Sequence, residues 1–364
     1  MVHFLILAAR KLGSWVIILT IAIALLELVL RMFDEIPVHK NPLSGFHVAD
    51  STLGWIGRPE YRGRFRSQDF DVVIEHDAQG FRRATFDTDK LAESTRRIAL
   101  LGDSFTWGWG VENNELFANL LQERLGTSVL VKNYGVNAFG TAQELLLFDR
   151  YVQELDPDTV IVMLYANDLD ENVDPRKGKR PWFELEDGQL VARNQPVSTP
   201  SIGLFKQLSQ KSTAISTIKF TYHLVIDAFK SPPEGIYEYV EPVIPEDRWA
   251  LMAALLAELH RRCGLDDPEC ELRIVYIPTR AEVSAYDADQ VPVVPAGLKE
   301  ICDKAGIHFL DLRPDLYSAW QQAEPPAWDV TPVYFPHDGH LDTRGHQVVA
   351  EALAHSLGVP KRVN

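Results

Sequence analysis

The chain has 364 residues, of which 46% are hydrophobic and 24% charged, so it can bury a full-sized core and does not have the composition of a disordered chain. A formal net charge of -15 would repel a polyanion over most of the surface, which argues against a nucleic-acid-binding protein. A neutral or locally steered substrate is easier to accommodate, and we expect one main domain with accessory elements.

An apolar run near the N-terminus predicts a membrane anchor. Residues 12–30 are almost entirely apolar, and at about 1.5 Å of rise per residue the run is roughly long enough to cross one hydrocarbon core. Two basic residues precede it, which favours an N-terminus on the inner side, although Arg31 weakens that count. We expect residues 1–35 to anchor the chain in the inner (cytoplasmic) membrane through residues 12–31, with the rest on the outer, periplasmic side.

Two alternatives to a retained anchor stay open. Ala22-Ile23-Ala24 resembles a small-residue processing site, which is the pattern of a cleaved signal peptide. A buried helix of a soluble protein is the other alternative. The apolar character continues through Leu30, and this favours an uncleaved anchor.

The three cysteines cannot all pair within one chain. Cys263 and Cys270 are close enough to close a small loop in an oxidising compartment, and unpaired thiols are the alternative. Their spacing does not suggest a metal site, and we expect no cofactor.

Residues 36–90 read as a β-rich extension between the anchor and the main domain, which spans residues 91–364. Turn residues are frequent in this stretch, and short alternating segments such as residues 70–75 predict small β-hairpins.

From about residue 91, short apolar runs alternate with helical patterns. Helices are predicted over residues 115–125 and 141–154 and after Thr343. The predicted buried strands cover residues 97–101, 128–133, 159–164, 272–277 and 307–311. Strands that alternate with helices of this length form parallel βαβ units, so we expect an α/β fold of three layers (α/β/α) around a five-stranded, mostly parallel sheet.

An insertion at about residues 172–245 separates the third and fourth predicted strands. It contains a predicted hairpin at residues 186–188 and a helical stretch over residues 204–229. Long insertions beside a site often form a lid or a partner surface, so we expect this segment to contribute to specificity.

A serine follows the first predicted strand directly. In doubly wound sheets, ligands bind beyond the carboxyl ends of the strands, which places Ser104 of the sequence Gly102-Asp103-Ser104 at the functional edge. A Gly-Asp-Ser tripeptide alone is also a common turn.

A histidine near the C-terminus can serve as its base. A serine needs a base to accept its proton, and a histidine needs a carboxylate to fix its tautomer. In an extended loop, residues two apart project to the same side, so Asp338 can reach the ring of His340. Asp342 is better placed to cap the following helix.

Two further histidines are less suited to catalysis. We expect His337 and His346 to lie at the surface or to face a helix. A metal site made from these two residues with Asp338 and His340 is disfavoured, because Ser104 explains the histidine without a metal.

Two weaker motifs follow the second and third strands. Asn167, within Tyr165-Ala166-Asn167-Asp168, can donate its side-chain N–H to a developing oxyanion, and Asp168 can fix the turn beneath it. The Gly-rich segment over residues 133–141 can supply a backbone N–H. Each of these motifs alone is an ordinary turn or connection.

In their chain order, these four loops resemble the motifs of SGNH (GDSL-like) hydrolases, from about residue 97 to residue 357. The resemblance implies a flavodoxin-like sheet, with Ser104 as nucleophile and its own N–H in the oxyanion hole. Asn167 then matches the family's asparagine, and His340 its catalytic histidine, supported by Gly345 five residues later.

Two positions depart from the family pattern. The second oxyanion donor is expected five residues beyond Asn133, where Ala138 replaces the usual glycine; its N–H stays usable there only at negative φ, and Gly140 is the fallback. Many relatives place the triad aspartate three residues before the histidine, a position held here by His337, whereas others use the spacing of Asp338.

The resemblance implies a serine esterase that acts on short acyl esters, with O-acetyl groups on envelope polysaccharide as the expected substrate. Segments at residues 50–55 and 77–82 are also similar to those of membrane-anchored bacterial members. Alternatives are an O-acyltransferase that uses the same serine with a sugar hydroxyl as acceptor, and a non-catalytic envelope scaffold or binding module that retains the fold.

Overall fold

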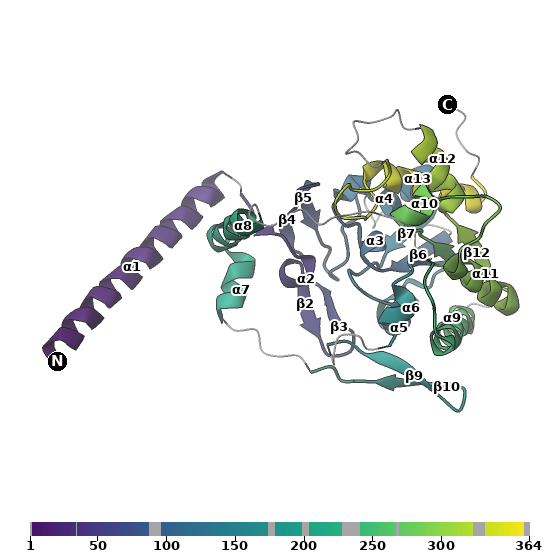
Figure 1. Ribbon diagram of the computed structural model, residues 1–364, viewed down its shortest axis with the longest axis horizontal. Coiled ribbons are helices and arrows are strands. Elements are labelled where there is room, and N and C mark those ends of the chain that lie inside the picture. The colour runs from purple at the N-terminus through teal and green to yellow at the C-terminus, as the bar shows by residue number, and fades with distance from the viewer. Residues whose placement is uncertain are drawn as a thin grey trace.

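The computed structural model describes residues 2–33, 35–86, 96–173, 179–198, 204–227, 241–266, 269–322 and 332–359. The expected boundary near residue 90 therefore lies outside the described residues. Figure 1 shows a long N-terminal helix, α1 (Val2–Met32), that projects from a body of helices around a central sheet.

The central sheet has five strands, and every ladder between them is parallel. Their order is β12-β11-β8-β6-β7, so the chain starts in the interior and winds outward in both directions. The strands are β6 (Arg96–Gly102), β7 (Val129–Asn133), β8 (Thr159–Leu164), β11 (Glu271–Tyr276) and β12 (His308–Asp311). The predicted five-stranded α/β fold is confirmed.

Side chains of the strands alternate between two cores, one on each face of the sheet. Ile98 and Leu100 point into one core, whereas Ala99 and Leu101 point into the other. Every residue of β8 is buried, as expected for a central parallel strand covered by helices on both faces. This explains why the strands read as continuous apolar runs in the sequence.

Helices cover both faces of the sheet (Figure 1). The first face is covered by α4 (Phe117–Leu125), α10 (Arg280–Ser284), α12 (Arg313–Gln322) and α13 (Thr343–Ser356). The second is covered by α5 (Thr141–Leu147), α9 (Glu246–Asp266) and α11 (Val293–Ala305). Shorter turns are α3 (Ser104–Trp107), α6 (Asp168–Glu171), the 3-10 turns η1 (Asn113–Glu115) and η3 (Gln153–Leu155), and the π turn η2 (Phe148–Val152).

The extension is a packed β unit. Its elements are β1 (Val38–His39), α2 (Pro42–Gly45), β2 (His47–Asp50), β3 (Gly54–Gly57), β4 (Arg62–Arg66) and β5 (Asp71–Glu75). Strands β1, β4 and β5 form one sheet, and β2 pairs with β3 in a hairpin. The buried Arg82 guanidinium donates to the carbonyls of Trp107, Gly108 and Val111, which ties the extension to the loop after α3.

The described part of the insertion consists of a hairpin and two helices. It forms the hairpin β9 (Trp182–Glu186) and β10 (Gln189–Arg193), as predicted, and the helices α7 (Leu204–Lys211) and α8 (Thr213–Asp227). Figure 1 places α8 beside the C-terminal end of α1, with α7 packed against α8. Cys263 and Cys270 form a disulfide between α9 and β11, and Cys302 is a buried free thiol.

Candidate active site

The candidate site is a pocket of about 510 Å³ at the carboxyl ends of the sheet strands. Ser104, Asn167 and His340 all line it, together with Ala138 and Asp338. The structure therefore brings together the five residues predicted for the triad and the oxyanion hole. The reason is topological, because the carboxyl ends of parallel strands meet at one edge.

Ser104 is held at the start of a short helix. Gly102 ends β6 at a φ of +152°, where a Cβ would lie 2.1 Å from Thr106 Oγ1, so only glycine fits. Asp103 then caps α3 by accepting a hydrogen bond of 2.9 Å from the Phe105 N–H. This turn leaves Ser104 only 8% exposed, with its hydroxyl facing the pocket.

His340 connects Ser104 to a carboxylate. Its Nε2 lies 2.8 Å from Ser104 Oγ, and its Nδ1 is in a short hydrogen bond with Asp338 Oδ1. A ring nitrogen beside a hydroxyl and a carboxylate on the opposite nitrogen are the arrangement needed to take a proton from the hydroxyl and stabilise the imidazolium.

Trp109 supports both members of this pair and was not found by sequence reasoning. Its indole stacks on the His340 ring, with centroids 4.6 Å apart and planes 8° from parallel. Its Nε1–H donates to Asp338 Oδ2 at 2.8 Å. No spacing rule points to this tryptophan, because it lies 229 residues from Asp338 in sequence.

The loop that carries His340 is fixed from two directions. The Asp69 carboxylate of the extension lies 2.6 Å from His337 Nδ1 and accepts from the His337 N–H at 3.0 Å. From α10, Arg280 Nη1 donates to the carbonyl of Pro336 at 2.7 Å. The side chain of His337 is therefore engaged by Asp69.

The remaining polar candidates have structural partners. Asp342 caps α13 by accepting from the Gly345 N–H at 2.8 Å, as predicted, and does not line the pocket. His346 is buried, stacks on Phe117 and accepts from the Phe117 N–H at 3.2 Å. The four residues weighed as a metal set thus do not converge on one point.

Residue 138 lines the pocket in a left-handed conformation. We expected a usable N–H here only at negative φ, and that expectation is wrong: Ala138 has φ +59°, so the alanine adopts, at a cost in strain, the left-handed backbone conformation that a glycine would adopt freely. Its N–H therefore stays a candidate donor. Its carbonyl accepts from the buried Arg180 guanidinium at 2.8 Å, which holds the peptide. The fallback, Gly140, does not line the pocket; it precedes α5 at φ -116°.

Three buried carboxyl groups form a cluster that includes Asp103 of the pocket lining. Asp103, Glu144 and Asp168 are each almost fully buried, and Asp168 accepts from the Tyr165 N–H at 2.9 Å, which fixes the turn that bears Asn167. Burial and mutual repulsion raise the pKa of Glu144 and Asp168 well above their usual ranges, and burial raises the pKa of Asp103 to about 6. Asn167 hydrogen-bonds to Asp103, so this cluster supports the asparagine.

One wall of the pocket comes from the extension. Lys40, Asn41 and Leu43 line it opposite residues of the sheet edge. Sequence reasoning treated this segment as a connection, because nothing local marks a residue that reaches a site more than sixty positions away.

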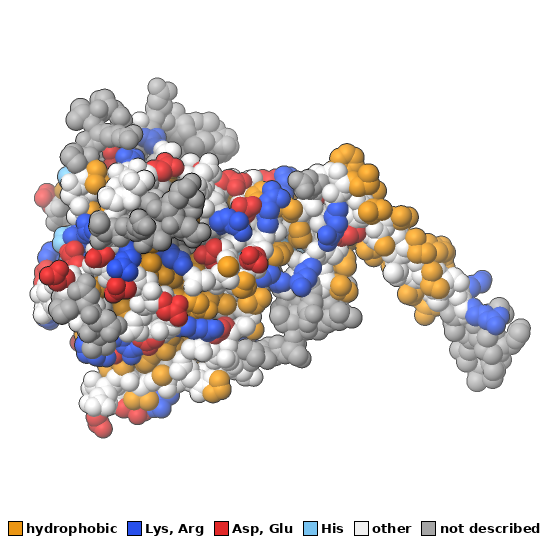
Figure 2. All heavy atoms as spheres, turned by 180° about the vertical axis from the view of Figure 1, so that it is seen from behind, with side chains coloured by type: hydrophobic (Ala, Val, Ile, Leu, Met, Phe, Trp, Pro, Cys, Tyr) orange, Lys and Arg blue, Asp and Glu red, His pale blue; other side chains and the backbone are white. Residues whose placement is uncertain are grey.

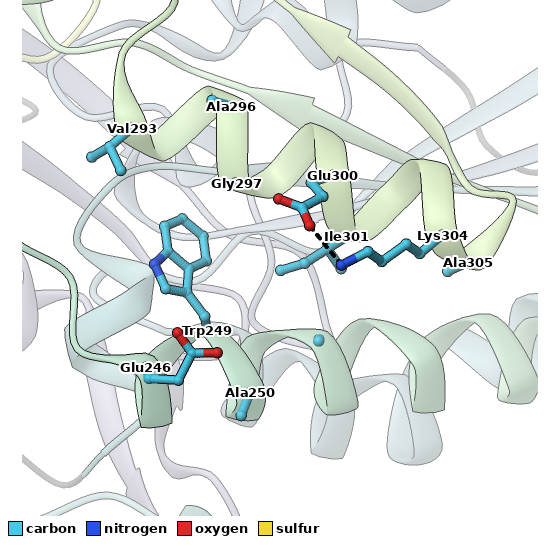
Figure 3. Close-up of a pocket in the computed structure, with 11 residues that line it drawn as sticks. Glu246, Trp249, Ala250, Val293, Ala296, Gly297, Glu300, Ile301, Lys304 and Ala305 are labelled. Carbon is cyan, nitrogen blue, oxygen red and sulfur yellow. Dashed lines mark hydrogen bonds and ion pairs between the residues drawn. The ribbon is translucent and has the colours of Figure 1, made fainter.

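A second cavity, of about 670 Å³, lies between α9 and α11 (Figure 3). The Trp249 ring and small residues such as Ala250, Ala296 and Gly297 line it. On α11, Glu300 forms an ion pair with Lys304, one turn further along the helix. Its lining contains none of the candidate residues and no serine, threonine, cysteine or histidine. Size alone is therefore a poor guide to the site in this molecule.

The doubly wound sheet and a pocket centred on a serine define an α/β enzyme. The model of the GDSL-like Lipase/Acylhydrolase family matches residues 100–348. Because this match covers more than half of the sequence, the chain belongs to that family and is an ester hydrolase.

Solved structures of similar proteins include three esterases or hydrolases. LAE5, an alpha/beta hydrolase from the metagenome of Lake Arreo, is 17% identical, with 73% of this chain and 96% of that one covered and a TM-score of 0.40. Est24, a carbohydrate acetylesterase from Sinorhizobium meliloti, is 14% identical, with 72% of this chain and 98% of that one covered and a TM-score of 0.39. Axe2, an acetylxylan esterase from Geobacillus stearothermophilus, is 14% identical, with 74% of this chain and 98% of that one covered and a TM-score of 0.40. No curated protein matches the sequence.

Proposed function

We propose that the protein is a membrane-anchored serine esterase that removes short acyl groups, with O-acetyl groups on envelope polysaccharide as the preferred substrate. The observation that carries the proposal is the 2.8 Å contact between Ser104 Oγ and His340 Nε2, with Asp338 on the other ring nitrogen.

In the proposed mechanism, His340 takes the hydroxyl proton as Ser104 Oγ attacks the ester carbonyl, and Asp338 stabilises the imidazolium. The backbone N–H groups of Ser104 and Ala138 and the amide of Asn167 stabilise the tetrahedral oxyanion. His340 then returns the proton to the leaving alcohol, which leaves an acyl-serine. Water, deprotonated by His340, attacks the acyl carbon and releases the carboxylic acid and free Ser104.

The proposed location rests on two features. Among the described residues, one helix, Arg10–Met32, is long and apolar enough to cross a membrane, with a mean hydropathy of 2.4, and none of that window is buried. The Cys263–Cys270 disulfide favours an oxidising compartment for the body of the protein. Both support an inner-membrane anchor with the pocket on the outer side.

Turnover of p-nitrophenyl esters of increasing chain length tests the activity. We expect the acetyl ester to be preferred, and Ser104→Ala and His340→Ala each to lower kcat by about 10⁴-fold or more, with little further loss in the double variant because the two act as one unit. Ser284→Ala, an exposed serine on α10, is the matched control and should retain full activity.

The triad acid is tested by a paired substitution. Asp338→Asn should lower kcat by about 10²- to 10⁴-fold, whereas Asp342→Asn should affect stability more than turnover. A fluorophosphonate should label the wild type and not Ser104→Ala. An unlabelled wild type, beside a control esterase that reacts, would instead favour a scaffold. Faster product formation with a sugar acceptor present would favour acyl transfer.

A further inference from the structure

The outer end of α1 carries a shielded stripe. Ile23, Glu27 and Leu30 are partly buried, whereas the other residues of α1 whose exposure the structure describes, from Arg10 to Met32, are exposed. Positions 23, 27 and 30 lie on one face of a helix, so a single neighbour covers this stripe. That neighbour is α8 together with Ser212, the residue before it, because both contact α1 directly.

Glu27 joins the two helices. Its carboxylate accepts hydrogen bonds from Ser212 Oγ at 2.7 Å, from the Ala214 N–H at 2.8 Å and from the Thr213 N–H at 3.3 Å. It also pairs with Arg31 at 2.7 Å. A helix N-terminus has unsatisfied N–H groups and a positive dipole end, so a carboxylate is well suited to this position. This contact explains an acidic residue inside an apolar run, where charge is otherwise costly.

A second contact fastens α8 to the chain that leaves α1. The Val38 N–H donates to Ser216 Oγ at 3.0 Å, and Thr213 Oγ1 donates to the Glu35 carbonyl at 3.3 Å. The first half of α8 is thus held from both sides and is largely buried.

The second half of α8 is exposed and apolar. Tyr222 is 61% exposed, Leu224 59% and Val225 53%, and Ile218 and Ile226 are exposed beside them. An apolar patch of this kind is unusual on a soluble surface and marks a docking site. The exposed Lys211 and Lys219 lie on the same helical pair, and Figure 2 shows blue Lys and Arg side chains where α1 joins the body.

We propose that α8 lies in the outer interface of the bilayer, with its apolar C-terminal half among the lipids and Glu27 as the latch that fixes it to α1. The occupant is the bilayer because α8 begins at the level of Glu27, inside the helix proposed to span the membrane. Basic residues beside an apolar face suit anionic head groups. This inference rests on the membrane anchor of the proposed function.

The docking would fix the position of the pocket. Lys40, which lines the pocket, follows Met32 by eight residues, a distance of at most about 30 Å even when fully extended. Two attachments, α1 and α8, would prevent rotation about a single anchor. The pocket would therefore meet substrates presented at the membrane surface.

Fluorescence quenching in proteoliposomes tests the proposal on the full chain. Single labels are placed through Tyr222→Cys and Val225→Cys, since Cys302 is buried and the other cysteines are paired. Vesicles contain phosphatidylcholine and phosphatidylglycerol with a spin-labelled lipid, and iodide is the aqueous quencher. Val291→Cys, which is 58% exposed and apolar but lies outside α7 and α8, is the matched control.

At positions 222 and 225 we expect the spin-labelled lipid to quench about half or more of the emission and iodide to have little effect. At position 291 we expect iodide to quench the emission and the spin-labelled lipid to have little effect. Iodide access at 222 and 225 equal to that at 291 would overturn the proposal and point to a protein partner. A label at Val16→Cys in α1 separates the two ideas: lipid quenching at 16 but not at 222 or 225 leaves the anchor intact and rejects only α8 docking.

The latch is tested in the Val225→Cys background. Glu27→Leu removes the carboxylate that caps α8, so iodide access at 225 should rise while lipid quenching at 16 is unchanged. If iodide access to the label at position 225 is unchanged, Glu27 does not fix α8 to α1. Enzyme turnover of p-nitrophenyl acetate, which needs no membrane, should persist in these variants, so loss of docking is distinguishable from failure of the proposed chemistry.

Discussion

Trp109 contacts both His340 and Asp338, the first by ring stacking and the second by a hydrogen bond. The indole face restrains the His340 ring, and the indole N–H restrains Asp338. A carboxylate that accepts a second hydrogen bond is a better-defined partner for the imidazole, because its orientation no longer depends on the histidine alone. Trp109 is therefore a positioning residue for the pair.

Trp109→Phe separates these two contributions. Phenylalanine retains a ring to stack on His340 but cannot donate to Asp338, so we expect kcat to fall by about 10-fold, the effect of one hydrogen bond to a charged group. Trp109→Ala loses both and should fall further. The split between kcat and KM is measured, with Trp249→Phe in the α9–α11 cavity as control. Unchanged kcat in Trp109→Phe would contradict the role.

Ala138 stores a small amount of backbone strain at the pocket. A left-handed conformation costs a residue with a Cβ about 1–2 kcal/mol, whereas glycine adopts it freely. Glycine also loses more entropy on folding, which offsets about 0.5–1 kcal/mol of the gain.

Ala138→Gly should therefore raise the free energy of unfolding slightly, by up to about 1 kcal/mol, and retain activity because the N–H is preserved. Ala138→Val, with a branched Cβ, should lose both stability and turnover. Thermal melts and p-nitrophenyl acetate turnover check this pair. A glycine variant that melts lower than wild type, or a valine variant as active as wild type, would show that the φ of residue 138 is not restrictive.

At the scale of elements, strands were easier to predict than the boundaries of helices. The predicted strands match β6, β7, β8, β11 and β12 to within one or two residues, because burial on both faces leaves an unbroken apolar run. The helix expected over residues 141–154 is α-helical only to Leu147 and continues as π and 3-10 turns. Apolar spacing does not distinguish these hydrogen-bond patterns.

Long-range roles of elements were not predictable. The extension was predicted to contain hairpins, which the structure has, but Asp69 and Arg82 also fasten it to the loops that carry the site. The insertion was expected to be a lid or a partner surface, and its described residues do not line the pocket. In both cases the role of the segment depends on contacts between different elements, some of them more than a hundred residues apart in the sequence. Local sequence patterns do not predict such contacts.

At the scale of the whole molecule, carboxylates have two opposite effects on stability. Exposed or paired groups such as Glu258, whose ion pairs with Arg261 and Arg262 lower its pKa to about 2, favour the folded state when ionised. The buried cluster of Asp103, Glu144 and Asp168 opposes folding when ionised. Neither oxygen of Glu144 has a hydrogen-bond partner among the described residues, so no hydrogen bond offsets the cost of burying this carboxyl group.

Glu144→Gln should make the protein less sensitive to alkaline pH. The folded-state pKa of Glu144 is raised above its unfolded value by burial, so its contribution to stability is present in acid and is lost as the pH rises through the folded-state pKa. Glutamine has nearly the same shape and cannot ionise. Measured between about pH 5 and about pH 8, the variant should therefore gain stability and Tm relative to wild type as the pH rises, by at most about 1.4 kcal/mol per pH unit, the limit for one proton.

Glu258→Gln provides the control for this comparison. The pKa of Glu258 is lowered, so its contribution is lost only as the pH falls below the ordinary carboxyl range, and its effect on Tm should be nearly constant over the same interval. Because the carboxylates of Asp103 and Asp168 repel that of Glu144, the variant reports on proton uptake by the cluster as a unit. Parallel melting profiles for wild type and Glu144→Gln across this range would mean that the cluster does not hold a proton in the folded protein.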